Sequence, residues 1–292
     1  MTFTITQNQN QNQYLTYCLK DEEADAYLEV VPARGGIITR WQICGEDIFY
    51  LDTERFKDPN LSVRGGVPIL FPICGNLPDN SYQHQGRNYT LKQHGFARDL
   101  PWQVSKQSSE TAASLTLELN SNEGTRQVYP FDFKLIFTYQ LQGNSLKIHQ
   151  KVINLSPEKM PFSIGFHPYF KVTDKTRLSF DIPSSQYLDQ STKTLHSYSG
   201  NFDFNLEEID AAFLQITRHQ SSFSDSYHQR QIVIGYDDLY TTIVFWTLKD
   251  KNYICLEPWS APRNALNTGE HLTYLEPQSS REAIVEMRVN QI

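Results

Sequence analysis

The chain has 292 residues, of which 39% are hydrophobic and 13% aromatic, so it has enough length and apolar surface to bury a large core. Its 26 lysines and arginines are outnumbered by 33 aspartates and glutamates, which gives a net charge of −7 with histidine neutral. This acidic balance argues against nucleic acid or an anionic membrane surface as the main partner.

The four cysteines, Cys18, Cys44, Cys74 and Cys255, form no C-x-x-C pair and have no zinc-finger spacing with histidine. We expect free thiols in a reducing compartment and no metal site. No apolar run approaches the ~20 residues that span a bilayer, and the first residues lack the basic and apolar regions of a signal peptide. A cytoplasmic protein is therefore expected.

From residue 27 onward, short β-branched and aromatic segments alternate with glycine, proline and asparagine, as is typical of an all-β protein. The predicted strands are 27–31, 37–43, 48–51, 102–104, 114–119, 131–141, 145–155, 177–180, 231–235, 241–248, 253–256 and 283–289. Gly143-Asn144 predicts a hairpin turn between two of the longest strands. One short helical turn is expected within residues 206–214.

No linker, repeat or change of composition divides the chain, so we predict a single domain over residues 1–292. Its first 13 residues include a tract of alternating glutamine and asparagine, which predicts a polar, mobile arm. The strand pattern predicts a large antiparallel sandwich. Residues 52–101 interrupt that pattern, and an irregular segment of this length inside a compact protein is usually functional.

Two titratable residues adjoin apolar strands beside prolines. His167 lies in Gly165-Phe166-His167-Pro168, and Glu257 follows the predicted strand 253–256 and precedes Pro258, where we expect the strand to end. The structural alternatives are a core histidine and an exposed edge carboxylate. If the two face each other, they are the minimal pair for proton transfer, because ordinary pKa values of ~4.3 and ~6.5 make one a base and the other a partial acid near neutral pH.

Arg64 and Arg98 flank the irregular segment, and their fork-shaped guanidinium groups suit carboxylate or phosphate oxygens. The alternative is that they pair with Asp79 or Asp99 and only shape the loop. A second histidine, His94, precedes Arg98 by four residues.

Three aromatic residues near these motifs, Trp259, Phe96 and Trp102, offer rings suited to the apolar face of a sugar. The burial habit of tryptophan favours a core position for both Trp259 and Trp102 over a sugar contact.

The order of four motifs resembles the aldose 1-epimerase (galactose mutarotase-like) superfamily from about residue 27 to the C-terminus. These motifs are 64–72 (RGGVPILFP), 93–98 (QHGFAR), 165–170 (GFHPYF) and 255–258 (CLEP). The resemblance implies a β-supersandwich and interconversion of the α and β anomers of an aldose without a cofactor.

The resemblance also implies roles for individual residues. Glu257 matches the general base, which removes the proton of the anomeric hydroxyl, and His167 matches the general acid, which protonates the ring oxygen. His94 matches the second active-site histidine. Asp210 matches the substrate-binding aspartate, with Asp237 as its rival.

The substrate is left open between two kinds of sugar. A neutral aldose is the first expectation, but Arg64 with its two following glycines and the His94-x-x-x-Arg98 spacing resemble the hexose-6-phosphate mutarotase branch. A catalytically silent carbohydrate-binding protein is a further alternative. A glycoside hydrolase or lyase is disfavoured, because hydrolysis normally needs two facing carboxylates and Glu257 alone stands in such a motif.

Overall fold

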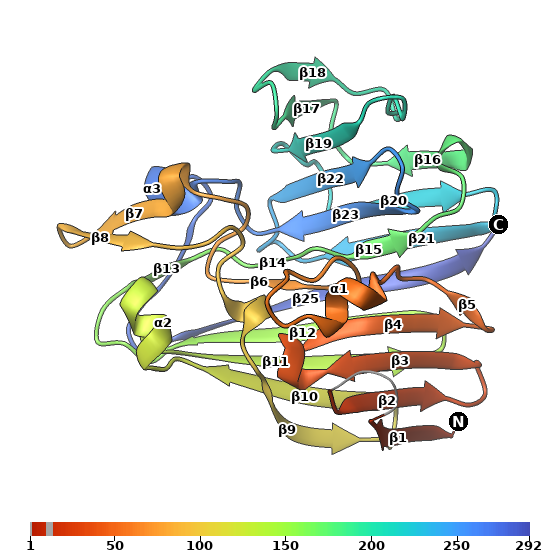
Figure 1. Cartoon of the computed structure of the whole chain (residues 1–292), viewed down its shortest axis with the longest axis horizontal. Coiled ribbons are helices and arrows are strands. Elements are labelled where there is room, and N and C mark those ends of the chain that lie inside the picture. The colour runs from red at the N-terminus through yellow and green to blue at the C-terminus, as the bar shows by residue number, and fades with distance from the viewer. Residues whose placement is uncertain (1, 10–13) are drawn as a thin grey trace.

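The computed structural model describes residues 2–9 and 14–292 and shows an all-β fold (Figure 1). The first sheet has the order β1-β2-β3-β4-β5, with β1 Phe3–Asn8, β2 Thr16–Asp21, β3 Ala26–Val31, β4 Ile37–Ile43 and β5 Glu46–Asp47. The second has the order β16-β20-β21-β25-β12-β11-β10-β9, with β9 Gln103–Ser108, β10 Ala113–Asn120, β11 Phe133–Gln142, β12 Ser145–Asn154, β16 Leu178–Asp181, β20 Gln220–Asp225, β21 Arg230–Tyr236 and β25 Ser280–Gln291.

The third sheet has the order β18-β17-β19-β22-β23-β14-β6, and β15 also pairs with β23. Its strands are β6 Ile69–Leu70, β14 Gly165–Phe166, β15 Tyr169–Lys171, β17 Gln186–Asp189, β18 Leu195–Ser197, β19 Glu208–Phe213, β22 Thr242–Leu248 and β23 Tyr253–Trp259. Two small antiparallel pairs complete the strands: β7 Ser81–His84 with β8 Arg87–Thr90, and β13 Met160–Phe162 with β24 Thr273–Leu275.

The helices are short. They are α1 Thr53–Lys57, α2 Glu123–Val128 and α3 Ala265–Thr268, with 3-10 turns η1 Pro32–Arg34, η2 Pro78–Asn80, η3 Ala97–Asp99 and η4 Lys175–Arg177. In the part of the chain that the structure describes, no helix is long and apolar enough to cross a membrane.

The second sheet packs against both of the others. Tyr139 on β11 donates a hydrogen bond to the carbonyl of Gly36 before β4, at 2.6 Å, and the ring of Phe137 on β11 lies 6.0 Å from that of Phe166 on β14. Isolated bridges, including Ile38 with Val67, join the first sheet to the segment that leads into the third. The first and third sheets therefore share one layer of a supersandwich, which confirms the predicted fold class (Figure 1).

Gly65 and Gly66 allow that junction. Both have positive φ, 136° and 61°, and a Cβ on Gly66 would lie 2.1 Å from the carbonyl oxygen of Ile38. Only a residue without Cβ lets the two backbones approach so closely. The Gly-Gly pair thus fixes the chain that carries Arg64 against the edge of the first sheet.

Strand alternation explains why the long hairpin was predictable. Along β11, Leu135 and Phe137 are buried against the core, while Lys134 and Thr138 on either side of them are half-buried on the other face. The turn at Gly143, with φ of 58°, joins β11 to β12 as predicted.

Several local predictions were wrong. Residues 206–214 contain β19 instead of a helical turn. Residues 48–51 form only isolated bridges, and the short strand β5 precedes them. Strands β1 and β2 and helix α2 were not predicted. Of the polar tract, Gln7 and Asn8 end β1, whereas residues 10–13 lie outside the described residues. The extent of the single domain stays a prediction.

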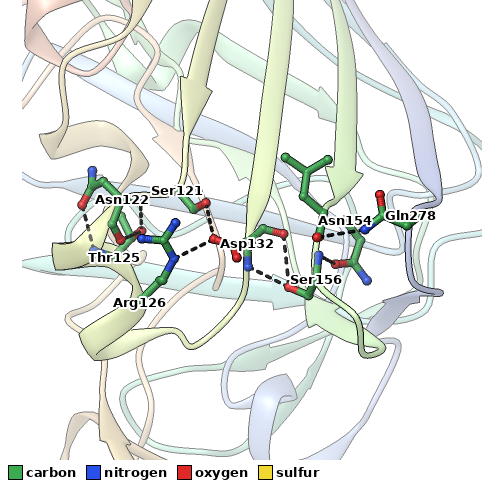
Figure 2. Close-up of polar contacts among 9 residues, drawn as sticks. Ser121, Asn122, Thr125, Arg126, Asp132, Asn154, Ser156 and Gln278 are labelled. Carbon is green, nitrogen blue, oxygen red and sulfur yellow. Dashed lines mark hydrogen bonds and ion pairs between the residues drawn. The ribbon is translucent and has the colours of Figure 1, made fainter.

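Helix α2 is held by a polar network at the turn between β10 and β11 (Figure 2). Asn122 Oδ1 accepts a hydrogen bond from the Thr125 amide at 3.0 Å, and Thr125 Oγ1 accepts one from the Asn122 amide at 2.8 Å. The Asp132 carboxylate accepts from Ser121 Oγ at 2.9 Å and from Arg126 Nε at 2.6 Å. This reciprocal cap satisfies amides that a helix of six residues would otherwise leave unpaired.

We expect Leu135→Ala to lower the free energy of unfolding by about 2–5 kcal/mol, because it removes a fully buried side chain from the layer interface. Lys134→Ala, the neighbouring variant on the outer face, loses a partly exposed ion pair with Glu118 and should cost under about 1 kcal/mol. Urea unfolding of both variants measures the difference. Equal losses would contradict this account of the core.

Candidate active site

A cavity of about 380 Å³ lies over the outer face of the third sheet and the loops beside it, within the range of about 300–1,000 Å³ typical of small-ligand sites. The seven residues predicted from sequence all line it: Arg64, His94, Arg98, His167, Asp210, Glu257 and Trp259. Lining residues that the sequence analysis missed include Arg55, Tyr169, Glu208, Trp246 and Arg263.

Strand register places His167 directly opposite Glu257. On either side of them, Gly165 pairs with Trp259 and Tyr169 pairs with Cys255, so the residue numbers of opposed pairs sum to 424, as do 167 and 257. The expected strand end at Glu257 was wrong, because β23 continues to Trp259.

The prolines explain why the ladder is interrupted at this point. Pro168 and Pro258 lack an amide hydrogen, so neither can donate to a continuous ladder. The partner of β23 is accordingly split into β14 and β15, with His167 in the gap. The sheet thus brings an imidazole and a carboxyl together from segments 90 residues apart, since 257 − 167 = 90.

His167 Nε2 lies 3.3 Å from Glu257 Oε1, and the two residues are 8% and 1% exposed. Burial lowers the pKa of His167 to about 3, with the positive charge of Arg98 acting in the same direction. Burial also raises the pKa of Glu257 well above its ordinary value, assisted by Asp210 and opposed by Trp259 and the nearby arginines. The neutral forms of both groups are therefore favoured, and the pair shares one transferable proton.

Trp259 orients the Glu257 carboxyl. Its indole Nε1 donates a hydrogen bond to Glu257 Oε2 at 3.0 Å, and its ring is only 1% exposed. The other two aromatic candidates lie in the core instead of the cavity: Phe96 stacks on Phe133 at 5.8 Å, and Trp102 donates to a backbone carbonyl.

His94 is held in one tautomer. Its Nδ1 accepts a hydrogen bond from the Gly75 amide at 3.0 Å, so in the neutral ring Nε2 carries the proton. Burial lowers the pKa of His94 well below its ordinary value, which favours that neutral form. The adjacent Gly95, with φ of 69°, brings the segment so close to Phe71 that a Cβ would lie 2.1 Å from its carbonyl oxygen.

Arg263, which no sequence motif singled out, joins two sides of the cavity. It donates to Asp210 Oδ2 at 2.6 Å and to Asn76 Oδ1 at 3.2 Å, and its guanidinium lies 5.8 Å from the Trp259 ring centroid. Its side chain also packs on Gly75, where a Cβ would lie 2.3 Å from Arg263 Cγ. Arg263 therefore fixes the substrate-binding candidate Asp210 and supports the loop that fixes His94.

Asp210 keeps one oxygen for a ligand, because its Oδ1 is buried and has no hydrogen-bond partner among the described residues. Burial raises its pKa, an effect that Arg263 opposes. The rival Asp237 lies outside the cavity, where its carboxylate accepts from the amides of Leu239 and Ile284 at 3.0 and 2.8 Å.

Arginines occupy another side of the cavity. Arg98 donates to the Gln93 carbonyl at 2.8 Å, Arg55 donates to the Ser62 carbonyl at 2.7 Å, and Arg64 lies 5.4 Å from the centroid of the Trp246 ring. Within the described residues no ion pair joins Arg64 or Arg98 to Asp79 or Asp99. The buried Arg98 Nε also has no hydrogen-bond partner there.

The sequence offered no metal-ligand spacing, but the fold assembles a ligand set. His167, Cys255 and Glu257 are all buried, and one ligand atom of each lies within 4.8 Å of the other two. The signal was invisible in the sequence because the cluster depends on the pairing of β15 with β23.

Two larger hollows, of about 490 and 900 Å³, lie elsewhere and contain none of the predicted site residues. In the first, Arg40 and Lys171 both pair with Asp47. In the second, Arg230 donates to backbone carbonyls of neighbouring strands. The residues predicted for acid–base chemistry line the 380 Å³ cavity instead.

We expect the ring resonances of His94 and His167 to show no titration between pH 5 and 8, because burial keeps both imidazoles neutral. In the unfolded chain the same imidazoles take up a proton below pH ~6.5, whereas in the folded protein they do not until pH approaches 3. Acidification through this range therefore favours the unfolded chain, and the free energy of unfolding falls as pH drops from ~6.5 towards 3. Imidazole nitrogen NMR measures both midpoints. A midpoint between 6 and 7 for His167 would contradict the buried neutral pair.

The family model described as aldose 1-epimerase matches residues 17–288. Protein LacX (chromosomal) of Lactococcus lactis subsp. lactis is 27% identical over 289 residues, covering 89% of this chain and 90% of that protein.

Among solved structures, the Slr1438 protein from Synechocystis sp. PCC 6803 superposes with a TM-score of 0.95 at 50% identity, over 96% of each chain. A galactose mutarotase-like protein from Clostridium acetobutylicum superposes with a TM-score of 0.82 at 18% identity, over 100% of this chain and 99% of that one, so this likeness concerns the fold. The family model spans nearly the whole chain, and the protein therefore belongs to the aldose 1-epimerase family.

Proposed function

We propose that the protein is an aldose 1-epimerase that interconverts the α and β anomers of a hexose by opening and closing its ring. The 3.3 Å contact between His167 Nε2 and Glu257 Oε1 inside the cavity carries this proposal. A protein that only binds sugar does not need a matched acid and base.

The other carboxylates of the cavity do not favour a glycoside hydrolase. Asp210 is bonded to Arg263 at 2.6 Å and Glu208 accepts from Trp246 Nε1 at 2.7 Å. Hydrolysis normally needs two carboxyl groups free to flank the scissile bond.

The proposed reaction conserves the protons of the pair. The neutral pair and the carboxylate–imidazolium pair differ only by the position of one proton along the 3.3 Å contact. From the charged form, Glu257 takes the proton of the anomeric hydroxyl while His167 protonates the ring oxygen, and the bond between C1 and the ring oxygen breaks to give the aldehyde. Rotation about C1–C2 presents the other face. Closure returns both protons, so each residue ends as it began.

His94 and Asp210 are proposed to hold the sugar. His94 Nε2–H is a donor for the region of the ring oxygen, and Asp210 Oδ1 is an acceptor for a hydroxyl. Arg263 acts through both of them and is a positioning residue. No step of this mechanism requires a cofactor.

We expect Glu257→Gln and His167→Asn each to lower the enzymatic mutarotation rate by about 10²–10⁴-fold, because each replaces one member of the proton-transfer pair with a polar side chain that does not exchange a proton near neutral pH. Polarimetry of freshly dissolved α-glucose, corrected for the spontaneous reaction, measures the rate. His149→Asn, on β12 and outside the cavity, is the matched control and should keep the wild-type rate. Unchanged rates in both site variants, with wild-type thermal unfolding, would contradict the assignment.

A hexose 6-phosphate is the second candidate substrate. The observation that favours it is a set of three arginines in the cavity. Arg55 and Arg98 donate to backbone carbonyls, and Arg64 lies over the Trp246 ring, so these contacts involve no carboxylate. A buried guanidinium with unpaired N–H groups is costly, and a phosphate supplies several acceptor oxygens.

If the phosphate is recognised, kcat/KM for glucose 6-phosphate should exceed that for glucose, and Arg64→Ala or Arg98→Ala should lower it by about 10–100-fold, the loss of one charge-assisted hydrogen bond. The rate with glucose should fall far less than the rate with glucose 6-phosphate in the same variants. Arg87→Ala, exposed on β8, is the control. Equal kcat/KM for the two sugars in the wild-type protein would favour the neutral hexose.

A further inference from the structure

Cys255 takes no part in the proposed reaction, yet it lies beside the catalytic pair. It precedes Glu257 by two residues on β23, so both side chains leave the same face of the sheet, and it pairs with Tyr169, which follows His167 by two residues. Cys255 is fully buried and its thiol is free. The thiol, imidazole and carboxyl ligand atoms all lie within 4.8 Å of one another.

The spacing of the imidazole and carboxyl is also compatible with two ligands of one metal ion. His167 Nε2 and Glu257 Oε1 are 3.3 Å apart. Two ligands at about 2.0–2.2 Å from a tetrahedral zinc ion are separated by about 3.3–3.5 Å. A proton or a zinc ion can therefore occupy the same place between them.

Cys255 can complete the set with a small movement. A sulfur at about 2.3 Å from the same ion lies about 3.6 Å from each of the other two ligand atoms. Its present separation from them is at most 4.8 Å, so a movement of the thiol on the order of 1 Å brings it to ligand distance.

We propose that His167, Cys255 and Glu257 form a binding site for a thiophilic divalent cation such as Zn²⁺, and that the bound ion inhibits the enzyme. Sulfur, imidazole nitrogen and carboxylate oxygen are the donors that zinc accepts, and three protein ligands leave a fourth position for water. His167 and Glu257 line the cavity, so the ion has an entry path.

Binding exchanges protons for the metal. Zn²⁺ displaces the proton of the His167–Glu257 pair and the thiol proton of Cys255, so two protons leave and the thiolate and carboxylate balance the charge of the ion. The affinity therefore rises with pH. Arg98 and the other nearby arginines oppose the cation, and bound sugar occupies the same cavity, so substrate and metal compete.

The inhibition, but not the site, rests on the proposed function, because the ion occupies the atoms that would move protons. Metal binding is tested separately from activity with Co²⁺ added to chelator-treated protein. We expect the thiolate-to-cobalt charge-transfer absorption and the intense visible bands of tetrahedral Co²⁺.

The charge-transfer band should be absent in Cys255→Ser and in Cys255→Ala, and the affinity for Co²⁺ should fall at least tenfold. Both substitutions are made because either one is a sufficient test if the other prevents folding. Cys74→Ser, which changes another buried thiol, should retain the band. A band that is missing in the wild-type protein, or that survives in the folded Cys255 variants, would overturn the site whether or not the protein is an epimerase.

Activity gives the second arm. Micromolar Zn²⁺ should inhibit mutarotation by the wild-type protein, EDTA should restore it, and Cys255→Ser should keep its basal rate while losing sensitivity at least tenfold. An enzyme that loses activity in EDTA and regains it with Zn²⁺ would overturn the inhibitory role. If the wild-type protein shows the cobalt band but no mutarotase activity, the metal site is supported and the epimerase proposal is rejected.

Discussion

The structure depends on burying an imidazole and a carboxyl in contact on a sheet whose opposite face is apolar core. Either group alone would be destabilising at the centre of a sheet, because desolvation penalises its charged form. Together His167 and Glu257 share one proton and can remain neutral without losing acid–base capacity. The indole of Trp259 fixes the carboxyl, and two prolines interrupt the ladder where the imidazole must enter.

Close backbone approaches position the loops around this contact. Gly66 lies against the carbonyl oxygen of Ile38 and Gly95 against that of Phe71, where a Cβ would collide, and these glycines hold the segments that carry Arg64 and His94. Arg263 then couples Asp210, Asn76 and the Gly75 loop into one support. The site is therefore positioned by several backbone segments rather than by one, which suits a reaction that needs a fixed sugar orientation.

Much of the fold follows from local alternation, as in β10 to β12, where one face is buried and the other half-buried. Strand β19 was not predicted because its last three residues, Ala211, Ala212 and Phe213, are all buried. Apolar and polar residues therefore do not alternate along it, and this alternation is the signal by which a half-buried strand is recognised. All seven predicted site residues line the cavity, but the places of Cys255 and Arg263 depend on strand register and loop packing. Cys255 lies within the motif 255–258, which gives no sign of its contact with His167, and Arg263 lies in none of the four motifs.

The arginines link substrate binding to the protonation of the pair. Arg98 lowers the pKa of both His167 and Glu257, so its charge disfavours the imidazolium form that the proposed ring opening requires. An anionic substituent held by Arg98 would neutralise that charge and satisfy its buried Nε. It would thereby make protonation of His167 easier once the sugar is bound. A neutral hexose leaves this charge in place, so the two candidate substrates differ in how far binding itself prepares the acid.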